Sequence, residues 1–357
     1  MFARPGYRRL WAARTVSQWG DAFNTVALAL LVFDRTGSGL GVTAVVAAEI
    51  VPVLLVAPVA GVVVDRVGPV RVTVSADLVR VVLAALPALV DEAELVPANS
   101  GIWTAAVLSQ IVLAPAAGAL VVMSGYAPAF LLNAASFAVS ALLLARLRLP
   151  HLAYPGAARQ PWPALVRAGF RIITQDRLLR ALAIGQLLAA VSAGATSALL
   201  VIYAAKHLHL NGRGYGFMLA AIGVGAAIGP LLLSRVRDPR RPAFVFGPYL
   251  LRAAVDTVLA TTRAPAAALA ALAGYGIGTS TGAVTFNSLL QAAAPPDARG
   301  RVFASFDLIW QVGRLGSLAL GGVTADRLGI SAVYAAGAVL LAVAAIVGWA
   351  GLATNEP

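Results

Sequence analysis

Seven polar side chains interrupt otherwise apolar stretches of the sequence, and they have the clearest capacity for chemistry. A charged group at the centre of a bilayer costs on the order of 3 kcal/mol or more, so groups at that depth generally serve a function. They can bind and release protons or hold the polar part of a substrate. The candidates for a substrate or proton pathway are Asp21, Asn24, Glu49, Arg252, Asp256, Asp307 and Arg314.

The spacing of four of these residues allows partners within one helix. Arg252 and Asp256 are four residues apart and share a helical face, where they can form a structural pair or a functional one. Arg314 follows Asp307 by one heptad and therefore lies on nearly the same face. The sequence leaves both interpretations of the Arg252–Asp256 pair open.

Asp21 and Glu49 have no oppositely charged residue at helical spacing within their own apolar stretches. Asn24, three residues after Asp21, shares its face. A charge without a partner in the same helix favours a functional role, and for a carboxylate that role is proton transfer.

The composition excludes an ordinary soluble domain. Of the 357 residues, 60% are apolar and only 12% are charged, about half the usual charged share. Stretches without Asp, Glu, Lys or Arg run over 95–145, 181–205, 214–234, 264–296 and 328–355. A helix needs roughly 20 apolar residues to cross a bilayer, so each stretch provides one crossing and the first provides two. The fold class is therefore an all-α membrane protein.

Eleven membrane-spanning helices are predicted, in a group of five and a group of six. They cover residues 10–33, 40–64, 72–90, 101–123, 126–145, 180–204, 214–234, 242–262, 265–292, 302–324 and 329–352. The long polar connection before the sixth predicts two helical bundles, 1–148 and 180–357, joined by a cytoplasmic linker at 149–179.

The arginines predict the orientation. Most of the 27 basic residues fall on one side if the N-terminus is cytoplasmic, and positive residues favour that side. The formal charge of +12 therefore needs no nucleic-acid partner. This assignment puts both Arg71 and the loop near 91–99 inside, although 72–90 can cross only once, so one crossing is missing between the second and fourth predicted spans.

A charged turn follows the second predicted span. It contains Gly61, Asp65, Arg66, Gly68 and Arg71, and it can be a specific contact element or an ordinary positive-inside loop. A second copy of the pattern, Gly322 to Gly329, falls on the opposite side, so the pattern alone does not identify a function.

The turn at 61–71 resembles the signature between the second and third helices of the major facilitator superfamily. Residues 17–28, 76–80, 129–137 and 286–302 resemble the branch that holds siderophore exporters and macrolide or multidrug efflux permeases. This resemblance implies two bundles related by a pseudo-two-fold axis and proton-coupled efflux of a small organic molecule by alternating access. It further implies a monomer in the plasma membrane, driven by the proton motive force and without a cofactor.

Two departures from that family are visible. Residues 113–118 carry alanine at two positions where family exporters have glycine, and residues 86–100 resemble the segment that follows the family's fourth helix. The fourth helix is therefore predicted to be absent, in agreement with the missing crossing. An alternative is a transport-inactive remnant of such a permease.

The resemblance also predicts two contacts. Asp65 should face the start of the span near Val302 and lock one conformation, because a carboxylate is stabilised at a helix N-terminus. Glu49 and Arg314 should pair across the bundle interface, and protonation of Glu49 would release Arg314. Asp21 is the competing proton carrier, and Arg252 is the competing cation.

An enzyme is the remote alternative. The sequence has no cysteine, and its three histidines, His151, His207 and His209, lie outside the predicted spans. Disulfides and thiolate metal sites are therefore excluded, and no metal site is predicted.

Overall fold

Every element that the structure describes is helical. The computed structural model describes residues 4–51, 95–145, 162–233, 235, 242–295 and 298–353. The helices are α1 (Pro5–Thr36), a helix at Gly39–Val51, α5 (Leu95–Ser124), α6 (Ala127–Ala145), α7 (Trp162–Gln175), α8 (Arg177–Ala198), α9 (Leu200–Ile202), the π-helical turn η2 (Tyr203–His207), α10 (Gly212–Leu233), α11 (Pro242–Thr261), α12 (Pro265–Ala293), α13 (Arg299–Leu328) and α14 (Ile330–Ala353).

Eight of the helices in the described part are long and apolar enough to cross a membrane: α1, α5, α6, α8, α10, α11, α12 and α14. Each of these eight helices coincides with one of the spans predicted from the sequence. Another predicted span, 302–324, lies within α13, and 40–64 begins in the helix at Gly39–Val51. The predicted span 72–90 and the predicted loss of the fourth helix lie outside the described residues.

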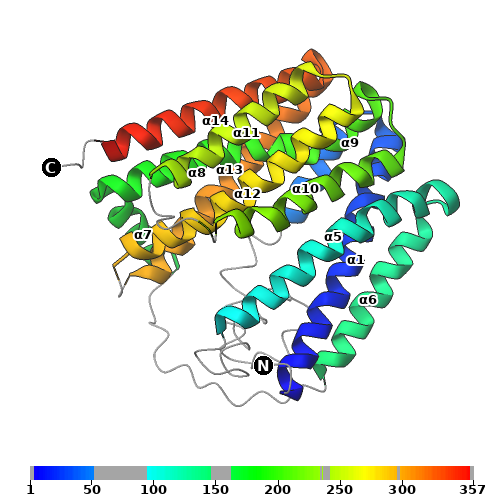
Figure 1. Ribbon diagram of the computed structural model, residues 1–357, viewed down its shortest axis with the longest axis horizontal. Helices are drawn as coiled ribbons and strands as arrows, with labels where there is room; N and C mark the ends of the chain where they lie inside the picture. Colours follow the sequence, from blue (N-terminus) through cyan, green and yellow to red (C-terminus); the bar gives the residue numbers. More distant parts are fainter. Residues whose placement is uncertain are drawn as a thin grey trace.

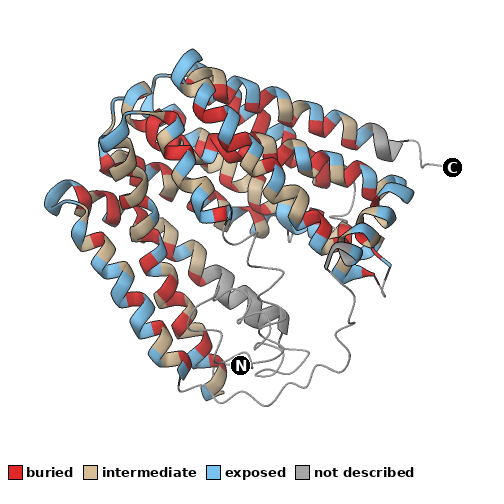
Figure 2. Cartoon of the chain, turned by 180° about the vertical axis from the view of Figure 1, so that it is seen from behind, coloured by how far each residue is buried: buried red, intermediate tan, exposed pale blue. Residues whose placement is uncertain are grey.

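The outer faces of the helices are apolar. Figure 2 shows exposed residues on the outward sides and buried residues where helices meet. Large apolar side chains lie on these outward sides, such as Leu131 on α6, which is 68% exposed, and Ile346 on α14, which is 64% exposed. A surface of this kind suits lipid rather than water.

The helices form two groups. Helices α1, α5 and α6 pack on one another, and α8 with α10 to α14 form the second group (Figure 1). The main contact between the groups is that of α5 with α10. A core that includes Leu30 and Val121 from the first group and Tyr203 and Tyr215 from the second joins them at one end.

This joined end carries the turn between α1 and the helix at Gly39–Val51, together with η2 and the α13–α14 turn. The opposite end carries the start of α1 and helix α7, and the two groups diverge toward it in Figure 1. A glycine produces the turn after α1. Gly37 adopts φ 60°, a left-handed conformation that favours glycine, and ends α1 with its N–H bonded to the Phe33 carbonyl at 2.7 Å.

The predicted linker contains a helix. Helix α7 packs on α13, where a Cβ on Gly169 would lie 2.6 Å from the Arg301 carbonyl oxygen. Asp176 then begins α8, because its side chain accepts a hydrogen bond from the Leu179 N–H at 2.8 Å.

Glycines set the distance between α5 and α10. A Cβ on Gly118 would lie 2.1 Å from the Gly212 carbonyl oxygen, and one on Gly216 would lie 2.4 Å from the Ala114 carbonyl oxygen. Glycine has no side chain to hold two backbones apart, so it permits this close approach. Small residues are enriched at contacts between membrane helices for the same reason. The joined end is therefore tightly packed.

Candidate functional site

A central cavity of about 860 Å³ lies between the two groups of helices. Ala106, Val107 and Gln110 of α5 line it from one side, and α8, α10, α11, α12 and α13 line it from the other. Further along α5, residues 114–118 make the close contact with α10. That contact separates the cavity from the joined end.

Apolar and aromatic side chains dominate the lining. The aromatic residues are Tyr249, Tyr275, Phe286, Phe303, Phe306 and Trp310. Three amides, Gln110, Gln186 and Asn287, add hydrogen-bonding groups that carry no charge. Ligand sites commonly combine an apolar wall with a few polar groups that orient the ligand.

Three charged residues also line the cavity: Arg252 of α11, and Asp307 and Arg314 of α13. All three are among the candidates that the sequence predicts. The sequence does not single out the aromatic residues and amides, because such residues are common in apolar helices and have no distinctive spacing.

Tyr275 is the main partner of Arg252. The guanidinium lies 5.0 Å from the centre of the Tyr275 ring, and its Nη2 donates to the Tyr275 hydroxyl at 3.4 Å. Arg252 is only 5% exposed, and its buried Nε has no hydrogen-bond partner in the described part of the chain. A cation over an aromatic face is stabilised by the ring quadrupole.

Asp256 points away from the cavity into the packing of α8, α11 and α14. It is fully buried, and its Oδ2 accepts a long hydrogen bond of 3.5 Å from the Ser192 hydroxyl. Its Oδ1 has no hydrogen-bond partner among the described residues. Asp256 and Arg252 attract each other electrostatically, yet each retains a polar atom without a hydrogen-bond partner among the residues that the structure describes.

Glu49 lies on the helix at Gly39–Val51 and Arg314 lies on α13, and their charges attract each other electrostatically. Glu49 is exposed near the end of the helix at Gly39–Val51, and Arg314 is half-buried at the cavity. Tyr275 also interacts with Arg314, so this tyrosine lies within the influence of both arginines of the cavity.

Asp21 and Asn24 are placed elsewhere. Both lie on α1, where Asp21 is exposed and Asn24 is half-buried, and neither belongs to the described lining of the central cavity. The structure therefore brings Arg252, Asp307 and Arg314 to one cavity with Glu49 nearby, and leaves the α1 pair outside it.

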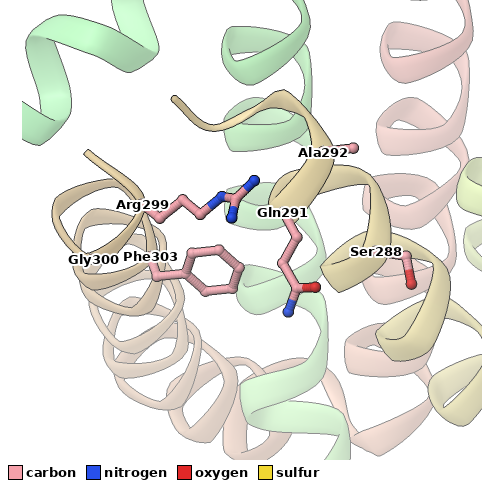
Figure 3. A pocket seen from close by; sticks show the side chains of 6 residues that line it. All are labelled: Ser288, Gln291, Ala292, Arg299, Gly300 and Phe303. Carbon is pink, nitrogen blue, oxygen red and sulfur yellow. The ribbon is translucent and has the colours of Figure 1, made fainter. Parts of the chain in front are cut away.

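The predicted lock residues Gly61, Asp65, Arg66, Gly68 and Arg71 lie outside the described residues. The helix start that Asp65 is predicted to face is described. A pocket of about 630 Å³ lies there between the end of α12 and the start of α13. Figure 3 shows the side chains of Gln291, Arg299 and Phe303 lining this pocket. The helix has no side-chain cap at Ala298.

The sequence matches the family model described as "Major Facilitator Superfamily" over residues 79–316 and again over 182–357. It is 26% identical over 366 residues to the "Multidrug efflux pump Tap" of Mycobacterium tuberculosis (strain ATCC 25618 / H37Rv), covering 89% of this chain and 86% of that protein.

Solved structures show the same fold at low identity. A bacterial homologue of the iron transporter ferroportin in an inward-facing state aligns with TM-score 0.68 and 17% identity, over 97% of this chain and 98% of that one. A mutant of the nucleoside transporter NupG aligns with TM-score 0.68 and 14% identity, over 98% of this chain and 100% of that one. The chain is therefore a multi-pass membrane transporter of the major facilitator superfamily, not an enzyme.

Proposed function

We propose that this transporter exports a small organic molecule, driven by the proton motive force, through alternating access of the central cavity. The observation that carries the proposal is the cavity itself. It lies between the two groups of helices, it is separated from the joined end by the α5–α10 contact, and it contains three charged residues. Sites of secondary transporters lie at such interfaces near the middle of the bilayer.

The lining favours an amphipathic substrate with an aromatic ring. Six aromatic side chains offer stacking surfaces, and the amides with Arg252, Asp307 and Arg314 offer polar contacts. The similarity to a protein named as a multidrug efflux pump supports export of such compounds.

Glu49 and Arg314 are the proposed coupling pair. Glu49 lies on the helix at Gly39–Val51 and Arg314 lies on α13, and the two charges attract each other. Protonation of Glu49 would remove that attraction and allow the groups to separate, whereas loss of the proton would draw them together again. Asp256 is the second carboxylate that could carry the proton, because it is buried beside Arg252.

The proposed setting is the plasma membrane, with the N-terminus and α7 in the cytoplasm. The basic residues of α7, Arg167 and Arg171, then lie on the side that positive charges favour. The transporter would work as a monomer with lipid around its apolar outer faces.

An efflux assay in cells tests the proposal. Cells that express the chain should accumulate less ethidium, an aromatic amphipathic dye, than cells without it, and a protonophore should abolish the difference. The Arg252→Ala variant should lose export, whereas Arg263→Ala, an exposed arginine outside the cavity, should retain it. Equal accumulation with and without the chain, for ethidium and a panel of aromatic drugs, would favour the transport-inactive remnant.

A further inference from the structure

The second copy of the charged turn, Gly322 to Gly329, lies at the joined end. Its Asp326 is exposed in the last turn of α13, beside the turn between α1 and the helix at Gly39–Val51. The two elements are very close, since a Cβ on Gly39 would lie 2.9 Å from the Ala325 Cβ. The central cavity does not use these residues.

The Asp326 carboxylate binds the start of the helix at Gly39–Val51. Its Oδ1 accepts from the Gly39 N–H at 2.6 Å, and its Oδ2 accepts from the Leu40 N–H at 3.1 Å and from the Ser38 hydroxyl at 2.6 Å. The Ser38 oxygen in turn accepts from the Gly41 N–H at 3.3 Å. The N–H groups of a first turn have no partner within the helix, and a negative charge there is stabilised by the helix dipole.

Lys206 makes the complementary contact. It is the only lysine of the sequence, and its Nζ donates to the Gly37 carbonyl at the end of α1 at 2.6 Å. It also lies 5.7 Å from the centre of the Phe33 ring. A cation is stabilised at a helix C-terminus, where free carbonyl groups remain.

We propose that Asp326 and Lys206 form a latch that holds the joined end closed and opens when the cavity turns to that side. Both charges belong to the group that contains α8 to α14, whereas their partners, residues 37–40, lie in the turn that directly follows α1. Separation of the two groups must therefore break both contacts together. The proposal rests on alternating access as proposed above, and it assigns a role to the copy of the turn on the side opposite the one predicted for Asp65.

Asp34 provides a matched control at the same end. Its carboxylate accepts a hydrogen bond from the Tyr126 hydroxyl, and both residues belong to the group that contains α1. This contact remains when the groups separate, so its loss should not open the joined end.

A cysteine reporter tests the latch without any transport measurement. The chain has no cysteine, so Ala204→Cys introduces a single thiol at a core position that is 1% exposed. Adding Asp326→Asn should raise its rate of reaction with a maleimide by on the order of tenfold, the effect of losing a strong helix cap. Lys206→Met should raise the rate in the same direction, and Asp34→Asn should leave it unchanged. Thermal unfolding shows that each variant is folded. An unchanged rate in a folded Asp326→Asn variant would overturn the proposal.

A reversible crosslink tests the opening itself. In the Gly39→Cys/Ala325→Cys variant the two Cβ atoms would start about 1 Å closer than the ~3.8 Å typical of a disulfide. A small shift of the backbone would bring them to that distance. Oxidation should block transport, and reduction should restore it. Full transport by the oxidised protein would show that transport does not require the joined end to open, and it would overturn the proposal. If neither the oxidised nor the reduced protein transports substrate, but Asp326→Asn still raises the labelling rate of the Ala204→Cys thiol, the proposed efflux function fails and the latch stands.

Discussion

At the scale of single residues, Tyr275 interacts with two arginines of the cavity. Arg252 stacks on Tyr275, and Arg314 interacts with the same tyrosine and with Glu49. The sequence predicts both arginines because a charge in an apolar stretch is conspicuous. It does not predict Tyr275, because an aromatic residue in a membrane helix is common and its role depends on which helix faces it.

The charge of Glu49 is expected to couple transport to protons. Glu49→Gln cannot release a proton, so it should lose accumulation driven by a pH gradient and retain exchange of substrate for substrate. Transport into inside-out vesicles measures both. Asp21→Asn is the comparison variant, because Asp21 on α1 is the competing proton carrier. Full coupling in Glu49→Gln would refute the assignment, and loss of coupling in Asp21→Asn would make Asp21 the carrier.

Tyr275 is expected to contribute to substrate affinity by orienting Arg252. Tyr275→Leu removes the ring beneath the guanidinium, which is worth about 0.5–2 kcal/mol, and should raise KM roughly 2- to 30-fold. Tyr275→Phe retains the ring and loses only the 3.4 Å contact of the hydroxyl, so its KM should stay close to that of the parent. Equal KM values for Tyr275→Leu and the parent would show that the ring has no such role.

At the scale of helices, the length and position of most elements follow from the apolar stretches. The single interruption at Gly125 and Tyr126 correctly divides 95–145 into α5 and α6. Helix α7 is harder to predict, because it lies within an arginine-rich connection and its apolar side packs on α13 and α8. The contact of α5 with α10 also depends on which glycines meet in three dimensions.

The glycine contact between α5 and α10 makes a prediction about stability. Gly118→Ala places a Cβ 2.1 Å from the Gly212 carbonyl oxygen and should cost about 1–3 kcal/mol through overpacking. Gly316→Ala has nothing within 4 Å and should be neutral or slightly stabilising, because alanine favours a helix. Thermal unfolding of the purified variants in detergent compares them. Equal midpoints would mean that the two helices do not approach this closely.

At the scale of the whole molecule, the sequence predicts two groups of helices, and the described helices form two. It could not indicate which end joins them, because that depends on contacts such as α5 with α10 and Asp326 with the start of another helix. Arginine placement predicts the orientation in the membrane but carries no information about the conformation that the helices adopt.

The orientation can be measured with single cysteines. Gln175→Cys lies at the end of α7 and should be in the cytoplasm, whereas Arg213→Cys lies in the first turn of α10 at the joined end and should be outside. Both positions are exposed. A membrane-impermeant maleimide added to intact cells should therefore label only the Arg213→Cys variant. Labelling of Gln175→Cys instead would reverse the orientation and the direction of transport.

Reconstitution of the purified chain in liposomes measures proton-driven transport without any other protein. Liposomes that contain only this protein and lipid would be given an acidic interior, and uptake of ethidium or another aromatic amphipathic dye would be followed by fluorescence. Accumulation should require the pH gradient, stop with a protonophore and disappear in the Glu49→Gln variant. Accumulation that is the same with and without the gradient, or no flux in either direction for the whole panel of dyes, would contradict proton-driven transport.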